Sequence, residues 1–246
     1  MVTTVLGTIP VGVASAVSWA ANVIAVLCVI PLCWTTLPAA AVPRALAGNG
    51  LATRLWALRE KTAPQPATWG IWAAAGIIGS AGMAIAGAPP SAWSLKLALS
   101  IGPLAVAYVA RYLAGVPWMM NRWDGLCLLL AGIGLGFLLF GEGLAALWLS
   151  IAVNIVGTPP TVMHALKEPW KESYFPFACA FVSVAAVLLL AIPVPWTVAS
   201  SAYGLYLLID VTVIMSAIAI GRSRARARGL GPDSAVYADH EAEPKW

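Results

Sequence analysis

Two ionisable side chains lie inside otherwise apolar stretches of this sequence, and they are the first candidates for chemistry. Asp210 lies in the middle of the run 196–220, and Lys96 lies in the run 91–113. A charge inside a membrane costs about 2.5–3.5 kcal/mol on insertion scales and marks a candidate functional site. Asp210 is therefore a candidate proton site, substrate anchor or partner of a neighbouring helix. We expect Lys96 to extend outward to the membrane surface, and its different depth argues against an ion pair with Asp210.

Uncharged polar side chains form a second group of candidates. Asn22 and Asn154 each lie in an apolar run. An amide in hydrocarbon seeks a hydrogen-bond partner on a neighbouring helix, so both asparagines are candidates for structural contacts. The alternative is that they line a central cavity together with Tyr203 and Asp210, where a hydroxylated or zwitterionic solute binds.

Two prolines recur at matched places in the chain. Pro31 and Pro160 each remove a backbone donor near the end of an apolar run, which bends a helix. One interpretation is that each proline makes a static kink. The other is a pair of hinges, since transporters whose two halves rock against each other need flexibility at matched positions.

Metal, cofactor and catalytic sites are not indicated by the sequence. The four cysteines lie in apolar runs without a CxxC pattern or a histidine partner, which is typical of small buried hydrophobic residues: Cys28, Cys33, Cys127 and Cys179. No catalytic cluster of His, Asp, Glu, Ser or Lys appears in the apolar runs. We therefore expect no metal, no cofactor and no enzyme activity.

The composition predicts the elements that position these residues. Of 246 residues, 61% are hydrophobic and 10% are charged, whereas a soluble domain has about half and about a quarter. A transmembrane helix needs roughly 20 mostly apolar residues. We predict an all-α polytopic membrane protein, surrounded by the lipid bilayer, with seven transmembrane helices at about 11–37, 67–87, 91–113, 124–141, 143–166, 174–192 and 196–220.

Basic residues gather on alternate links between these helices. These links and the chain end carry Arg44, Arg54, Arg59, Lys61, Arg111, Arg122, Lys167, Lys171, Arg222, Arg224, Arg226 and Arg228, and the opposite links carry no Lys or Arg. Lys and Arg mark cytoplasmic loops, so we predict an external N-terminus and a cytoplasmic C-terminus. The polar segment 222–246 is predicted to be disordered.

The sequence also indicates that the chain consists of two similar halves. Aligning Pro31 with Pro160 places helix one on helix five, and residues 101–104 of helix three then fall on residues 202–205 of helix seven. Two three-helix units joined by one helix must face the same way, which predicts a parallel 3+1+3 repeat. The predicted parts are a first unit at 1–113, a linker with helix four at 114–142, a second unit at 143–221 and a tail at 222–246.

This organisation resembles the SWEET and PQ-loop superfamily of membrane proteins. The shared features are the helix count, the external N-terminus, the 3+1+3 grouping and a proline near the cytoplasmic end of helices one and five. Residues 30–31, 61–72 and 157–162 look like those of bacterial PQ-loop-like membrane proteins. The chain departs from the family pattern because Leu32 and Thr161, not glutamine, follow the helix prolines. The asparagine pair of plant SWEETs is also missing.

The resemblance implies a transporter in a bacterial plasma membrane. We expect a small-solute carrier that works by alternating access on a sugar or another small polar metabolite, with homo-oligomers possible and no nucleic-acid partner. The alternative is a non-transporting membrane scaffold, sensor or assembly protein. A retinal photoreceptor is excluded because helix seven has no lysine for a Schiff base: the residue four after Asp210 is Ile214.

Overall fold

The computed structural model describes residues 1–28, 30, 33, 66–170 and 172–231. This part of the chain is mostly helical, as the sequence predicts, and contains seven α-helices. Five of them are long and apolar enough to cross a membrane, and two shorter apolar helices have 17 residues each. The chain is an integral membrane protein.

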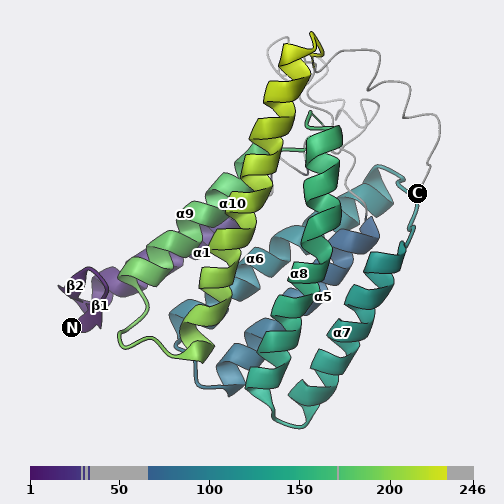
Figure 1. Cartoon of the computed structure of the whole chain (residues 1–246). Coiled ribbons are helices and arrows are strands. Elements are labelled where there is room, and N and C mark those ends of the chain that lie inside the picture. The colour runs from purple at the N-terminus through teal and green to yellow at the C-terminus, as the bar shows by residue number, and fades with distance from the viewer. Residues whose placement is uncertain (29, 31–32, 34–65, 171, 232–246) are drawn as a thin grey trace, which may run out of the picture.

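The helices begin and end close to the predicted turns. They are α1 at Val11–Leu27, α5 at Pro66–Ile85, α6 at Pro90–Tyr108, α7 at Arg122–Leu139, α8 at Gly143–Lys167, α9 at Tyr174–Leu190 and α10 at Val198–Ala227 (Figure 1). A π-helical turn, η2 at Val109–Leu113, continues α6. Side-chain caps fix two of the starts, since Asn121 opens α7 and Thr197 opens α10 with a capping box.

An N-terminal β-hairpin precedes α1 and was not predicted. Strands β1 (Val2–Thr4) and β2 (Gly7–Ile9) pair antiparallel, with Gly7 in the left-handed region at φ 115°. The backbone N–H of Val194 donates to the carbonyl oxygen of Thr3 at 2.9 Å. The hairpin therefore lies against the turn between α9 and α10. Strands of three residues carry too short a pattern to be recognised from sequence.

The end of predicted helix one and the start of the predicted tail are two boundaries that the described helices do not confirm. Most of the predicted end of helix one, including Pro31, lies outside the described residues, as do the basic residues between 34 and 65. At the other end of the chain, α10 continues to Ala227. The prediction of a disordered tail from residue 222 is therefore wrong for 222–227, while 232–246 lie outside the described residues. The helix continues because Arg222 donates hydrogen bonds to the carbonyl oxygens of Pro169 and Glu172, at 3.2 and 2.9 Å.

The helices pack in a regular order. Helix α6 packs against both α1 and α5, and α10 packs against both α8 and α9. Across the molecule, α5 packs on α8 and α1 packs on α9, while α7 covers α5 and α8. Helices α8 and α10 run side by side toward the same end of the bundle (Figure 1). Small residues allow close approach: a Cβ atom on Gly82 of α5 would lie 2.7 Å from the carbonyl oxygen of Gly143 of α8.

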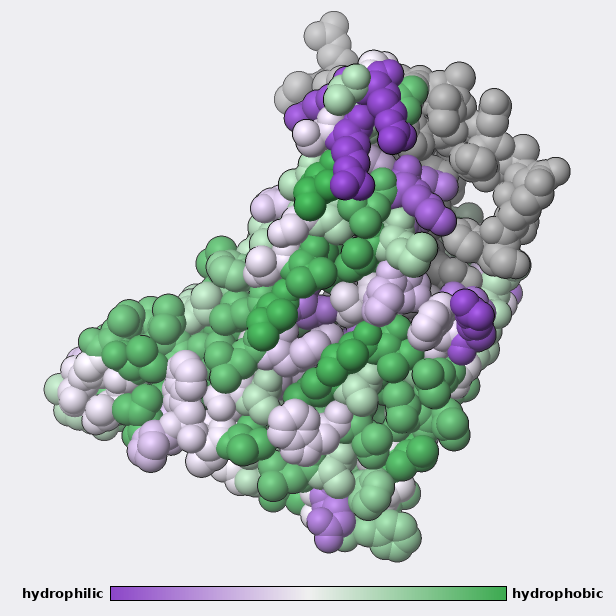
Figure 2. Space-filling view, viewed as in Figure 1, coloured by the Kyte–Doolittle hydropathy of each residue, from purple (hydrophilic) through white to green (hydrophobic). Residues whose placement is uncertain are grey.

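The surface of the bundle is strongly apolar. Hydrophobic residues cover the flank of the helices, and hydrophilic residues gather at the end where α10 terminates (Figure 2). Helix α7, for example, exposes seven large apolar side chains: Leu126, Leu128, Leu129, Ile133, Leu135, Phe137 and Leu139. An exposed apolar surface of this extent is typical of contact with lipid.

Candidate functional site

Lys96 lies inside the bundle and not at its surface. Its exposed fraction is 0%. A Cβ atom placed on Gly79 of α5 would collide with Cε of Lys96 and with Oγ of Ser150 on α8. The expectation that Lys96 extends outward is therefore wrong. The missing side chain at Gly79 leaves room for the lysine stem between α5, α6 and α8.

The ammonium group of Lys96 lies over the ring of Tyr203 on α10. Its Nζ is 3.1 Å from the ring centroid, which is a cation–π contact. Among the residues that the structure describes, none accepts a hydrogen bond from this nitrogen. A lysine ammonium has three donors, and leaving buried donors unbonded is costly. The contact thus leaves a buried amino group whose hydrogen-bonding capacity is unused.

Asp210 is bonded to a hydroxyl group of the facing helix. Oγ1 of Thr158 on α8 lies within hydrogen-bond distance of Oδ1 of Asp210 and of the carbonyl oxygen of Asn154, the latter at 2.8 Å. The hydroxyl of Tyr206 is 3.5 Å from the same Oγ1. A hydroxyl has one proton to donate. When Thr158 donates it to Asn154, its bond with Asp210 requires a proton on the carboxyl group.

Helix α10 presents three polar side chains on one face. Tyr203, Tyr206 and Asp210 are separated by three and four residues, so they stack along the same side of the helix. The ring centroids of the two tyrosines are 6.5 Å apart. Sequence reasoning missed Thr158 and Tyr206. The available signal was spacing, because Tyr206 precedes Asp210 by one helical turn and Thr158 follows Asn154 by one turn.

The two predicted asparagines lie at different interfaces. Nδ2 of Asn154 donates to the carbonyl oxygen of Ser150 in its own helix at 2.8 Å, so Asn154 reaches Thr158 only through its backbone. Nδ2 of Asn22 donates to Oγ of Ser94 at 3.0 Å, between α1 and α6. Its Oδ1 is buried and has no hydrogen-bond partner in the described part of the chain. The structure therefore groups Asn154 with Asp210 and places Asn22 in a separate contact.

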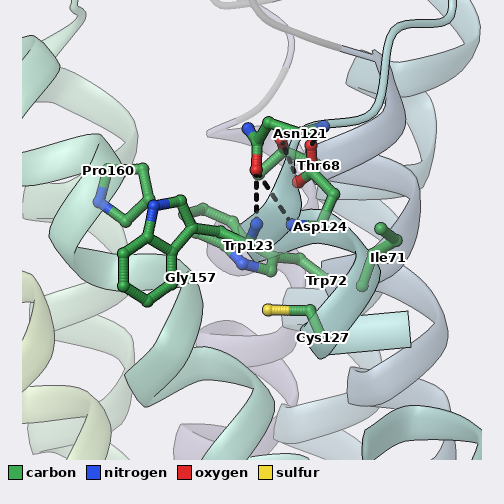
Figure 3. Close-up of a pocket in the computed structure, with 9 residues that line it drawn as sticks. All are labelled: Thr68, Ile71, Trp72, Asn121, Trp123, Asp124, Cys127, Gly157 and Pro160. Carbon is green, nitrogen blue, oxygen red and sulfur yellow. Dashed lines mark hydrogen bonds between the residues drawn. The ribbon is translucent and has the colours of Figure 1, made fainter. Parts of the chain in front are cut away.

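A second polar cluster lies between α5, α7 and α8 (Figure 3). It surrounds a cavity of about 10 Å³. The carboxylate of Asp124 accepts hydrogen bonds from the Thr68 hydroxyl at 2.8 Å and from the backbone N–H of Asn121 at 3.0 Å. The indole of Trp72 packs against Gly157 on the other side. Asp124 is fully engaged in capping α7 and joining it to α5, which gives this cluster a structural role.

Pro160 lines the same cavity. Helix α8 remains helical through Pro159 and Pro160, although each proline removes a backbone donor. Pro160 is two residues after Thr158, so a change of bend at this point displaces the Thr158 hydroxyl relative to α10. The hinge role of Pro160 stays a prediction.

A third cluster joins the ends of α8 and α10. Nε2 of His164 lies 3.7 Å from a carboxylate oxygen of Glu172. The Trp170 ring lies 5.1 Å from the guanidinium carbon of Arg222 and 5.4 Å from that of Arg226. Burial raises the pKa of Glu172 from 4.5 to about 7. This cluster fixes the long α10 end to the turn that follows α8.

Within residues 1–28, 30, 33, 66–170 and 172–231, no group of three or more His, Cys, Asp or Glu side chains is arranged to hold a metal ion. Comparisons with protein-family models, curated proteins and solved structures give no match to this chain.

Proposed function

We propose that the chain is a small-solute transporter of the SWEET and PQ-loop type that works by alternating access. The observation that carries this proposal is the bond between Thr158 and Asp210 inside the bundle. Asp210 is twelve residues after Val198 at the start of α10, which is about 18 Å along the helix. An ionisable group at this depth is expensive, and carboxyl groups in such places serve proton relays and substrate sites. The hydrogen bond between Asp210 and Thr158, in which either group can donate the proton, supports proton-linked transport.

Helix packing supports the proposed 3+1+3 repeat. In each proposed unit the third helix packs on the first and the second: α6 on α1 and α5, and α10 on α8 and α9. The contacts between units are reciprocal, since α1 packs on α9 as α8 packs on α5. A parallel repeat with a two-fold axis along the membrane normal requires this reciprocity. Helix α7 is then the linker helix of the proposal.

The interior fits an occluded conformation in this cycle. The cavities beside Lys96 and beside Trp72 have volumes of about 10 Å³ each, room for one water-sized group. Alternating access requires a conformation closed to both sides, followed by opening between the units. The same tight interior favours the second candidate, a non-transporting scaffold or sensor, and flux measurements separate the two.

Flux into proteoliposomes tests the proposal. Sugars, amino acids and vitamins are offered with and without an inward proton gradient. We expect uptake of at least one class, faster with the gradient, and loss of the gradient effect in Asp210→Asn. The matched control is Thr212→Val, whose exposed hydroxyl on α10 donates to the Leu208 carbonyl oxygen of its own helix. No uptake of any class by folded, reconstituted protein would refute transport.

A further inference from the structure

We infer that Lys96 anchors an anion site for small carboxylates that carry a short alkyl chain. The inference deepens the proposed transport function and rests on it for the role of the ligand. Its starting point is a buried ammonium group that contacts an aromatic ring and makes no hydrogen bond within the described chain. A carboxylate satisfies such a group best, because a charge-assisted hydrogen bond is about twice as strong as a neutral one.

No carboxylate of the described residues fills this role. Asp210 lies on the same helix as Tyr203 but seven residues further on, which is about 10 Å along the axis. Its oxygen is bonded to Thr158 instead. Ser150 donates its hydroxyl proton to the carbonyl oxygen of Ala75 at 2.7 Å. The amino group of Lys96 therefore has neither a hydrogen-bond acceptor nor a counter-ion among these neighbours.

A small cavity adjoins Lys96, and its chemistry defines the rest of the ligand. It lies between α5, α6, α9 and α10, and its walls are mainly aliphatic, including Leu95, Val184, Val187 and Leu188. Lys96 is the charged residue among those that line it in the described chain. A site with one cation and aliphatic walls matches a carboxylate joined to an alkyl group. A polyhydroxylated sugar would leave its hydroxyl groups unbonded there, which disfavours it.

The size of the cavity limits the ligand. Its volume of about 10 Å³ admits one water-sized group in this conformation. A Cβ atom on Gly204 of α10 would lie 3.0 Å from Cδ2 of Leu188 on α9, so these helices are already in close contact. A carboxylate is larger than this space, so the carboxylate and its alkyl chain both enter as α9 and α10 separate. Short chains are therefore favoured.

Calorimetric titration of the detergent-solubilised full chain tests the site. The probes are acetate, butyrate and butyramide, the last being the neutral analogue of butyrate. We expect butyrate to bind at least about tenfold more tightly than butyramide, since the amide cannot form the charge-assisted bond. Lys96→Met keeps the length of the stem and should remove this difference. Lys167→Met, at the exposed end of α8, is the control and should retain it.

A second variant examines the alkyl part without changing the charge. Gly204→Val narrows the space against Leu188 and should weaken butyrate more than acetate. Equal affinity for butyrate and butyramide in the unmodified chain, or no binding of either acid, would overturn the inference even if Lys96→Met failed to fold. Binding of the carboxylates without flux of these acids or of any other solute would support the site and refute its role in transport. Flux confined to neutral solutes, unaffected by butyrate, would refute the site and leave transport standing.

Discussion

The side-chain nitrogen of Lys96 lies 3.1 Å from the centre of the Tyr203 ring, so α6 and α10 touch through this pair deep in the bundle. These helices are the third helices of the two proposed units. A rocking movement between the units changes the contact between them. The Lys96–Tyr203 pair is thus the place where the proposed ligand binding and the proposed rocking movement would meet.

Packing at Gly79 should be essential for stability. In Gly79→Ala the new methyl group meets Cε of Lys96 and Oγ of Ser150, and both side chains are buried. We expect a loss of about 1–3 kcal/mol, measured by thermal unfolding in detergent. Gly132→Ala on α7 is the control, because a Cβ atom there has no neighbour within 4 Å. A Gly79→Ala protein as stable as Gly132→Ala would contradict this packing.

The Thr158 hydroxyl should stabilise the junction of α8 and α10. Thr158→Val keeps the shape but leaves the Asp210 carboxyl without this partner. We expect a loss of about 1–3 kcal/mol of unfolding free energy, with recovery in Thr158→Ser. Thr212→Val removes an exposed hydroxyl that donates to the Leu208 carbonyl oxygen of its own helix and should change stability by less than about 0.5 kcal/mol. Similar losses in the two valine variants would argue against the interhelical bond.

Glu172 should make stability depend on pH. Burial raises its pKa from 4.5 to about 7, so between these values the folded chain binds more protons at this site than the unfolded chain does. Its contribution to stability is therefore present below pH 4.5 and is lost as the pH rises through about 7. Melting curves between these pH values should show a decline that Glu172→Gln removes. Glu168→Gln is the control, and a decline unchanged in Glu172→Gln would contradict the assignment.

Arg222 should hold the last turns of α10 in helical form. Its guanidinium group donates to the carbonyl oxygens of Pro169 and Glu172, and each such charged bond contributes about 1.5–3 kcal/mol. In Arg222→Gln we expect amide hydrogen exchange in 222–227 to accelerate by about tenfold or more. Arg224→Gln, on an exposed position of the same turn, should leave the exchange rate nearly unchanged. Equal protection in both variants would show that these bonds are not needed.

The proposed orientation can be tested by labelling. We expect Glu142→Cys, in the turn between α7 and α8, to react with a membrane-impermeant maleimide added outside intact cells. Arg228→Cys, at the end of α10, should react only after permeabilisation. Both positions are exposed, so accessibility of the side chain does not limit the reaction. The reverse pattern would refute an external N-terminus and a cytoplasmic C-terminus.

The helices were largely determined by local sequence. Apolar runs long enough to span a bilayer, separated by proline and glycine turns, predicted α5 and α9 to within a few residues. The pattern also identified Asp210 as a charge in the middle of a helix, because depth along a helix follows from residue number alone. The hairpin at Val2–Ile9 was missed, since short strands lack a period that can be recognised.

The direction of Lys96 and the partner of Asp210 were decided only by tertiary structure. Lys96 turns inward because Gly79, on another helix, leaves space for its stem. Asp210 meets Thr158 because α8 and α10 pack side by side. Likewise, α10 continues beyond Arg222 because carbonyl groups of a distant turn accept its hydrogen bonds. Sequence fixes where a polar group lies along its own helix, whereas contact between helices decides which group it meets.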